Sequence, residues 1–99
     1  MSPIKKKKLE KLRKQLDKLD DSLIKIIKKR TNLVKQVLNL KDYKNQIVDQ
    51  KRIEFILNKL KVEALKRGLS IEFIEEIWTL MIKNFIKYEE EIFDEVHKK

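Results

Sequence analysis

The chain has no cysteine, one proline, one glycine and one histidine among its 99 residues. Without cysteine there are neither disulfides nor thiolate chemistry, and a reducing compartment fits. Gly68 is the only glycine, which excludes a glycine-rich phosphate loop. His97 lies in a terminal "HKK" with no second histidine and no cysteine to complete a metal set. We therefore expect His97 to be a solvated tail residue, and we expect no metal and no cofactor.

Long apolar runs are absent as well. No run approaches about 18 residues, and no signal-peptide pattern follows Met1. We therefore expect a soluble cytoplasmic protein with no membrane partner. Leu, Ile, Lys and Glu dominate the composition, which favours long helices and argues against sheets. The length predicts a single domain over residues 1–99.

The net charge of +9 is unevenly distributed. Residues 1–41 carry 14 Lys/Arg and 4 Asp/Glu, whereas residues 69–99 carry 4 and 8. A basic half attracts nucleic acid, a membrane surface or a small anion, and only the small anion requires cations that face inward. The lysine run Lys5–Lys8 has no interleaved aromatic residues and no recognition motif after it. We therefore expect a frayed, solvated basic N-terminus over residues 1–8 and no nucleic-acid partner.

Apolar residues recur every three or four positions from Leu9 and predict one helix from about residue 5 to residue 41. Such a helix is about 55 Å long. It would extend well beyond a compact globule of this length, whose radius of gyration is about 13 Å. We therefore expect an intertwined homodimer built around two long helices. The stripe consists of Leu9, Leu12, Leu16, Leu19, Leu23, Ile26/Ile27, Arg30, Val34, Val37 and Lys41.

Two further helices are indicated by their end signals. Asp49 suits the N-cap of the second helix, Gly68 suits the left-handed position after it, and Ser70 suits the N-cap of the third. The expected fold is therefore all-α, with three helices per chain. The stripe of the third helix consists of Ile74, Ile77/Trp78, Met81, Phe85, Glu89, Ile92 and Val96.

Charged residues interrupt these stripes at Arg30, Lys41 and Glu89. One interpretation is snorkelling, in which the stem of a long cation is buried and its head stays in water. However, Arg13 lies beside the first stripe and Arg52 begins the second helix, so four cations can converge on a helix-walled cavity. Isolated buried cations are very costly, and a polyanionic ligand would compensate them. Arginine offers a bidentate fork for carboxylates and lysine a compact point charge.

Four segments carry a family resemblance: "LRKQLDKLDDSLIKIIKKRTNLVKQVLNLK", "VDQKRI", "ALKRGLS" and "FIEEIWTLMIKNFIKYEEE". Over about residues 9–92 they resemble the all-α chorismate mutase family. The most specific element is L-R-x-x-[IL]-D-x-[IL]-D, with an arginine 17 residues after the first and a lysine 11 residues later. The resemblance implies an intertwined dimer of three-helix chains. It also implies a pericyclic rearrangement of chorismate to prephenate, which needs no metal and no cofactor.

The resemblance also implies roles for individual residues. Arg13 matches an arginine that reaches from the long helix into the partner's active site. Arg30 matches the arginine that binds the side-chain carboxylate of the substrate. Lys41 matches the lysine that binds the ether oxygen and a carboxylate. These cations would therefore hold a small dianion.

Other positions leave the substrate open. Asp49 and Arg52 match polar positions at the start of the second helix, and Glu89 matches a Gln or Glu that contacts the ether oxygen. Ile53 stands where a glutamate usually contacts the substrate hydroxyl, and Phe85 stands at a position that is usually Ser. These departures look more like the isochorismate pyruvate lyase branch, while Glu89 favours the mutase. A non-catalytic helical dimer of the same fold is the third alternative.

Overall fold

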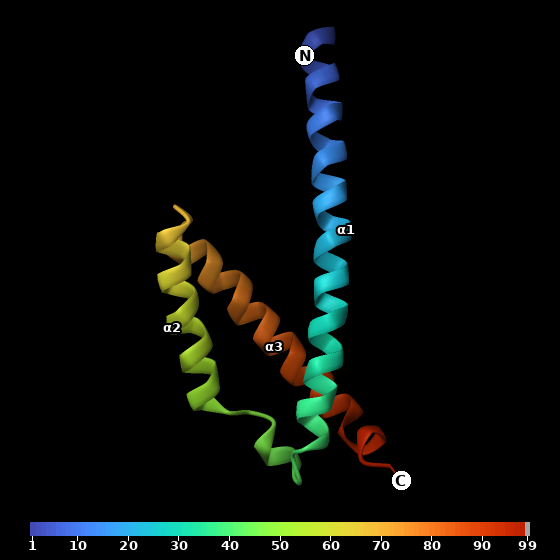
Figure 1. Cartoon of the computed structure of the whole chain (residues 1–99), viewed down its shortest axis with the longest axis vertical. Helices are drawn as coiled ribbons and strands as arrows, with labels where there is room; N and C mark the ends of the chain where they lie inside the picture. Colours follow the sequence, from blue (N-terminus) through green and yellow to red (C-terminus); the bar gives the residue numbers. More distant parts are fainter. Residues whose placement is uncertain (99) are drawn as a thin grey trace. The chain divides into compact units, whose positions relative to one another are not determined.

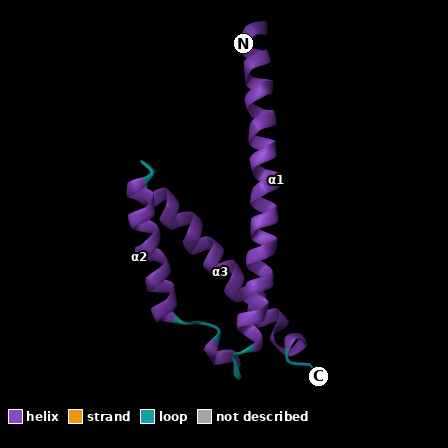
Figure 2. Ribbon diagram, in the orientation of Figure 1, coloured by secondary structure: helices purple, strands orange, loops and turns teal. Residues whose placement is uncertain are grey.

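The computed structural model describes residues 1–98 and is built from helices (Figures 1 and 2). Within these residues there is no strand, and the predicted all-α fold with three α-helices and a long first helix is confirmed. A short 3-10 helix, which the sequence did not indicate, precedes the second α-helix. The elements are α1 (Pro3–Asn39), η1 (Lys44–Gln46), α2 (Gln50–Lys66) and α3 (Ile71–Val96).

Helix α1 begins and ends two residues earlier than the sequence predicted. Pro3 occupies its first position, where the missing N–H costs nothing, and the Ser2 hydroxyl accepts from the Lys5 N–H at 3.2 Å. The lysine run Lys5–Lys8 therefore lies in the first turns of the helix, in place of the predicted frayed start. At the other end the helix stops at Asn39, so Lys41 lies outside it and not on its stripe.

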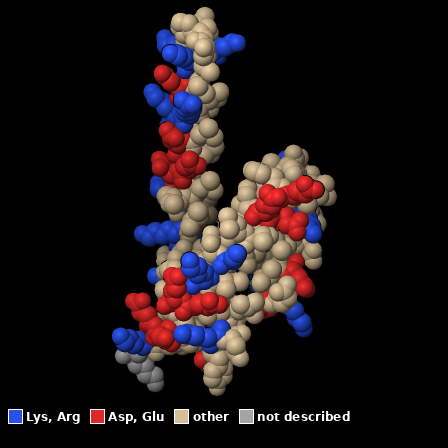
Figure 3. All heavy atoms as spheres, turned by 180° about the vertical axis from the view of Figure 1, so that it is seen from behind, with Lys and Arg blue, Asp and Glu red and all other residues tan. Residues whose placement is uncertain are grey.

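The chain divides into two compact units, of which the first is Met1–Val34. This unit consists almost entirely of one amphipathic helical stretch whose apolar side is exposed. Figure 3 shows charged side chains gathered along one side of it and a largely tan surface along the other. The apolar residues Leu12, Leu16, Leu19 and Leu23 are 54 to 61% exposed. A continuous apolar stripe of this kind is typical of a surface that another protein covers.

The second unit, from Lys35 onwards, contains a small core. Leu38, Ile47 and Phe93 are buried at its centre, and Ile86, Ile92 and Val96 pack around them. The predicted stripe placed Val37 in the core, but Val37 is 50% exposed and Leu38 is fully buried. Neighbouring residues on a helix point about 100° apart, so the last turn of α1 presents a different face to the core than the stripe predicts. Periodicity alone does not fix which face a short helix end buries.

Helices α2 and α3 pack together as a hairpin in this unit (Figure 1). Gly68 adopts a left-handed φ of 67° after α2, as predicted. The Leu69 N–H donates to the Ala64 carbonyl at 2.9 Å, which closes the end of α2 in a Schellman motif. Ser70 then caps α3, because its hydroxyl accepts from the Phe73 N–H at 3.2 Å. The short connection makes α2 and α3 antiparallel neighbours.

Candidate active site

Lys41 is held by its backbone and its side chain just beyond the end of α1. It is half-buried, and its N–H donates to the Leu38 carbonyl at 3.1 Å. Its ammonium nitrogen lies 3.3 Å from the Ile47 carbonyl, to which it donates. Its own carbonyl oxygen lies 2.7 Å from Nε2 of His97. These contacts fix a cation at the connection between α1 and η1.

An open hollow of about 440 Å³ begins at Lys41, within the size range of small-molecule sites. Two lysines, two glutamines, one valine and one aspartate contribute to its lining. Its lining residues are Lys41, Gln46, Val48, Asp49, Gln50 and Lys51. The hollow therefore suits a small, negatively charged and hydrogen-bonding molecule.

The start of α2 forms one wall of this hollow. Asp49 is the N-cap of α2, as predicted, and its carboxylate accepts from the Arg52 N–H at 3.1 Å. The exposed Arg52 guanidinium lies 5.3 Å from the centre of the Phe55 ring, a cation–π contact. Ile53 is half-buried in the first turn. The carboxylate of Asp49 thus orders the helix start that carries Lys51 and Arg52.

Glu89 is a buried charged residue of α3, only 8% exposed. It lies one turn before the buried Phe93, on the helix face that also carries Ile82 and Phe85. Phe85 itself is half-buried. The prediction that a glutamate occupies a core register of the third helix is therefore confirmed.

The remaining predicted site residues, Arg13 and Arg30, lie on the part of α1 that belongs to the first unit. Arg13 is exposed and Arg30 is half-buried. Of the predicted residues, the structure thus brings Lys41 and Asp49 to one hollow, with Arg52 three residues further along the chain. It leaves Arg13 on a solvent-facing stretch of helix.

A comparison with protein families decides which family this chain represents. Residues 12–90 match the family described as chorismate mutase type II. The chain belongs to this family. No individual curated protein matches the chain. The matched range includes every predicted site residue, from Arg13 to Glu89, whereas the lysine run at the N-terminus and His97 lie outside it.

Four residues of the hollow were not predicted from the sequence: Gln46, Val48, Gln50 and Lys51. Gln46 caps η1, because its side-chain oxygen accepts from the backbone N–H groups of Asp42 and Tyr43 at 2.7 and 2.8 Å. Gln50 and Lys51 come directly after the N-cap Asp49. The sequence signal for Gln50 and Lys51 is their position in the first turn of a predicted helix whose N-cap, Asp49, is itself a candidate site residue.

His97 is not the solvated tail residue that the sequence predicted. It is half-buried, and its ring lies 4.1 Å from the Phe93 ring, centre to centre. Both of its ring nitrogens contact backbone carbonyl oxygens, those of Phe93 and Lys41. Its spacing of four residues from Phe93 on α3 is the signal that was available, since residues four apart share a helix face.

Within residues 1–98, no group of three or more His, Cys, Asp or Glu side chains is placed to hold a metal ion. None of the helices in this part of the chain is both long enough and apolar enough to cross a membrane.

Proposed function

We propose that this protein is a chorismate mutase that rearranges chorismate to prephenate. The observation that carries the proposal is that Lys41 lines a hollow of small-molecule size, in a chain that matches the chorismate mutase type II family over residues 12–90. The reaction is pericyclic and uses no nucleophile. The protein must therefore bind its substrate, hold it in the compact reactive conformer and stabilise the negative charge that develops in the transition state.

Lys41 is the residue to which we assign charge stabilisation. As the C–O bond breaks, negative charge develops on the ether oxygen, and a fixed cation there lowers the barrier. The ammonium of lysine has three N–H donors, and the Ile47 carbonyl accepts from one. The remaining donors are the ones we assign to the ether oxygen and the neighbouring carboxylate. Because backbone contacts hold Lys41, this stabilisation needs little reorganisation.

Two arginines are assigned to the carboxylates of the dianion. Arg30 binds the side-chain carboxylate, and Arg13 of a second chain binds from across the dimer interface. Both guanidiniums offer the planar fork that matches a carboxylate. Arg52 adds positive charge beside the hollow. When both ends of a flexible substrate are held in its compact conformer, the conformational entropy is lost on binding. It then no longer adds to the barrier of the reaction step.

The exposed apolar side of the Met1–Val34 unit supports a homodimer. Leu12, Leu16, Leu19 and Leu23 are more than half exposed in the single chain, although they form an unbroken stripe. A second copy carries an identical stripe, so a two-fold interface can cover both at once. The same arrangement would bring Arg13, exposed in one chain, to the active site of its partner.

The proposed function is tested by supplying the purified protein separately with chorismate and with isochorismate. We expect prephenate from the first and no salicylate or pyruvate from the second. The isochorismate assay is needed because Ile53 and Phe85 depart from the usual mutase residues. Salicylate with pyruvate would assign the lyase reaction instead. Turnover of neither substrate would favour a non-catalytic helical dimer.

Glu89 is assigned to the ether oxygen, to which it can contribute only as a neutral acid. A carboxylic acid donates a hydrogen bond, whereas a carboxylate repels the developing negative charge. Rising pH removes this proton, so we expect kcat to fall as pH increases. Glutamine donates at every pH, so Glu89→Gln should flatten the profile of kcat against pH. An unchanged profile in this variant would exclude the acid role of Glu89.

A further inference from the structure

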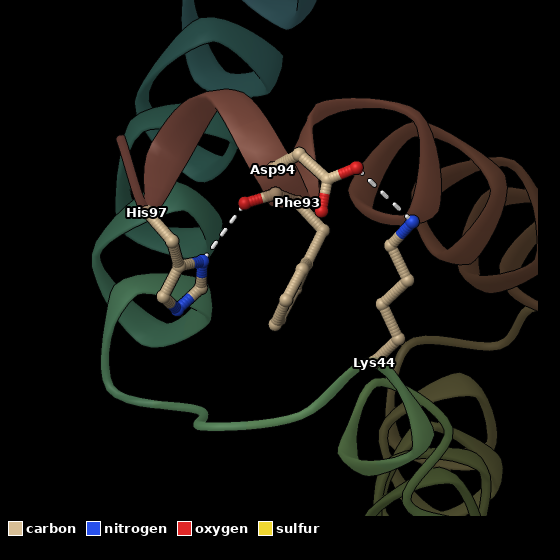
Figure 4. Close-up of polar contacts among 4 residues, drawn as sticks. All are labelled: Lys44, Phe93, Asp94 and His97. Atoms are coloured by element: carbon tan, nitrogen blue, oxygen red, sulfur yellow. Dashed lines mark hydrogen bonds and ion pairs between the residues drawn. The ribbon is translucent and has the colours of Figure 1, made fainter. Parts of the chain in front are cut away.

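His97 links the end of α3 to the backbone of Lys41. Its Nδ1 lies 2.8 Å from the Phe93 carbonyl oxygen, which Figure 4 shows, and its Nε2 lies 2.7 Å from the Lys41 carbonyl oxygen. The second contact joins residues 56 positions apart in the sequence. The ring also stacks at 31° on Phe93, whose side chain is buried in the core of the second unit. His97 is therefore fixed on both sides.

The chemistry of these contacts limits which ring nitrogens of His97 carry a proton. Carbonyl oxygens only accept hydrogen bonds, and a neutral imidazole has a single N–H. The imidazolium form donates to both carbonyls, and the neutral ring protonated at Nε2 donates to the Lys41 carbonyl. His97 is also the C-cap of α3, where the partial negative charge of a helix end attracts a cation.

Lys41 needs this contact because it lies past the end of α1. Inside a helix its carbonyl would accept from the residue four positions later, but here the chain has already left the helix. The His97 ring takes that place at 2.7 Å. Lys41 is thus held at its N–H by Leu38, at its carbonyl by His97, and at its ammonium by Ile47.

We propose that His97 is a positioning residue that fixes Lys41 for the reaction through the Lys41 backbone carbonyl. This inference rests on the proposed function, since it takes the Lys41 ammonium as the group that contacts substrate. His97 itself touches the backbone and not the hollow. It lies outside residues 12–90, which match the family.

We call the two contacts of the His97 ring, with the carbonyls of Phe93 and Lys41, the clamp. Other charged groups lie near it, and their effects have to be distinguished from those of His97. Lys44 on η1 pairs with Asp94 on α3 at 3.4 Å (Figure 4), which engages the carboxylate next to Phe93. Lys98 follows His97, and Lys41 itself carries a charge. Glu89 lies two turns earlier on α3 and is assigned its own pH dependence above.

NMR tests the clamp without any substrate. In the full-length protein, we expect the ring N–H proton of His97 that faces the Lys41 carbonyl to be observable, because hydrogen bonding slows its exchange with water. The ¹³C shift of the Lys41 carbonyl should change in His97→Phe, which removes the donor. Fast exchange of the ring proton, with a Lys41 carbonyl shift that is the same in His97→Phe as in the wild type, would overturn the clamp.

Two amide variants then test positioning in the enzyme. The side-chain nitrogen of glutamine reaches about as far as Nε2, whereas that of asparagine reaches only as far as Nδ1. His97→Gln can therefore still donate to the Lys41 carbonyl, and His97→Asn can donate only towards Phe93. We expect His97→Asn to lower kcat about tenfold. A 1 Å displacement of a catalytic group can cost about a hundredfold, and loss of one backbone contact should displace Lys41 by less than that. We expect kcat close to wild type in His97→Gln.

The controls separate this role from plain stability and from the proposed function. The ether oxygen gains charge only in the transition state, so misplacing Lys41 should change kcat more than KM. Lys98→Ala removes a neighbouring exposed cation and should leave kcat unchanged. Equal kcat in the asparagine and glutamine variants, at temperatures where both are folded, would overturn the positioning role. If the wild type makes no prephenate, the proposed function fails while the NMR result still decides the clamp.

Discussion

Lys41→Ala is expected to lower kcat/KM for chorismate about a hundred- to a thousandfold, the usual loss when one preorganised charge-stabilising group is removed. The alanine variant keeps the backbone contacts to Leu38 and His97, so the connection keeps its course. What it loses is the ammonium to which we assign charge stabilisation. Steady-state formation of prephenate measures the loss, and circular dichroism with thermal unfolding shows whether the variant is folded.

Two other lysines make this prediction specific. Lys35→Ala removes an exposed cation from the same unit and should leave kcat/KM unchanged. Lys51 lines the same hollow from the first turn of α2. Lys51→Ala should weaken binding of the dianion and raise KM, with a smaller effect on kcat. A Lys41→Ala variant that is folded and as active as the wild type would contradict the assignment of Lys41.

The helices could be predicted because their signals are local. Hydrophobic periodicity indicated three helices, and Asp49, Gly68 and Ser70 marked their ends where the structure has them. Each of these residues acts through its own backbone or through an N–H three residues away. Such signals do not depend on the rest of the fold, so a single sequence is sufficient to read them.

Features that depend on contacts between distant residues were not predictable in the same way. The apolar periodicity predicted that the first helix extends to Lys41, with Val37 in the core. The helix ends at Asn39, and Leu38 is buried instead of Val37. His97 was assigned to a solvated tail, because nothing in the "HKK" segment indicates a hydrogen bond to a residue 56 positions away. Both differences arise where α1 and α3 end, in the core of the second unit.

The candidate site shows the same division. The residue types followed from the pattern, since a charge inside an apolar stripe stands out, and Glu89 is indeed buried. The hollow did not follow, because Gln46 enters it from a 3-10 helix that periodicity cannot detect. The sequence thus indicated the chemistry of the site, and the structure showed that Lys41 lies in the connection between α1 and η1.

Mixing two inactive variants is expected to restore activity, because the proposed dimer draws Arg13 and Lys41 of each active site from different chains. Arg13→Ala and Lys41→Ala homodimers each lack one of these cations at both sites. In a dimer of one chain of each kind, one site combines the intact Lys41 of the first chain with the intact Arg13 of the second. The other site lacks both cations.

The proposed dimer also predicts how much of the wild-type activity returns. Random pairing makes half of the dimers mixed, and half of their sites are complete, so about a quarter of wild-type activity returns. Co-unfolding and refolding of the two variants in equal amounts, followed by a prephenate assay, measures it. Adding Leu16→Glu and Leu23→Glu to both variants places charges on the exposed apolar stripe and should prevent pairing and recovery. No recovery from the refolded mixture without the glutamates, while sedimentation shows dimers, would place Arg13 in the active site of its own chain or in none.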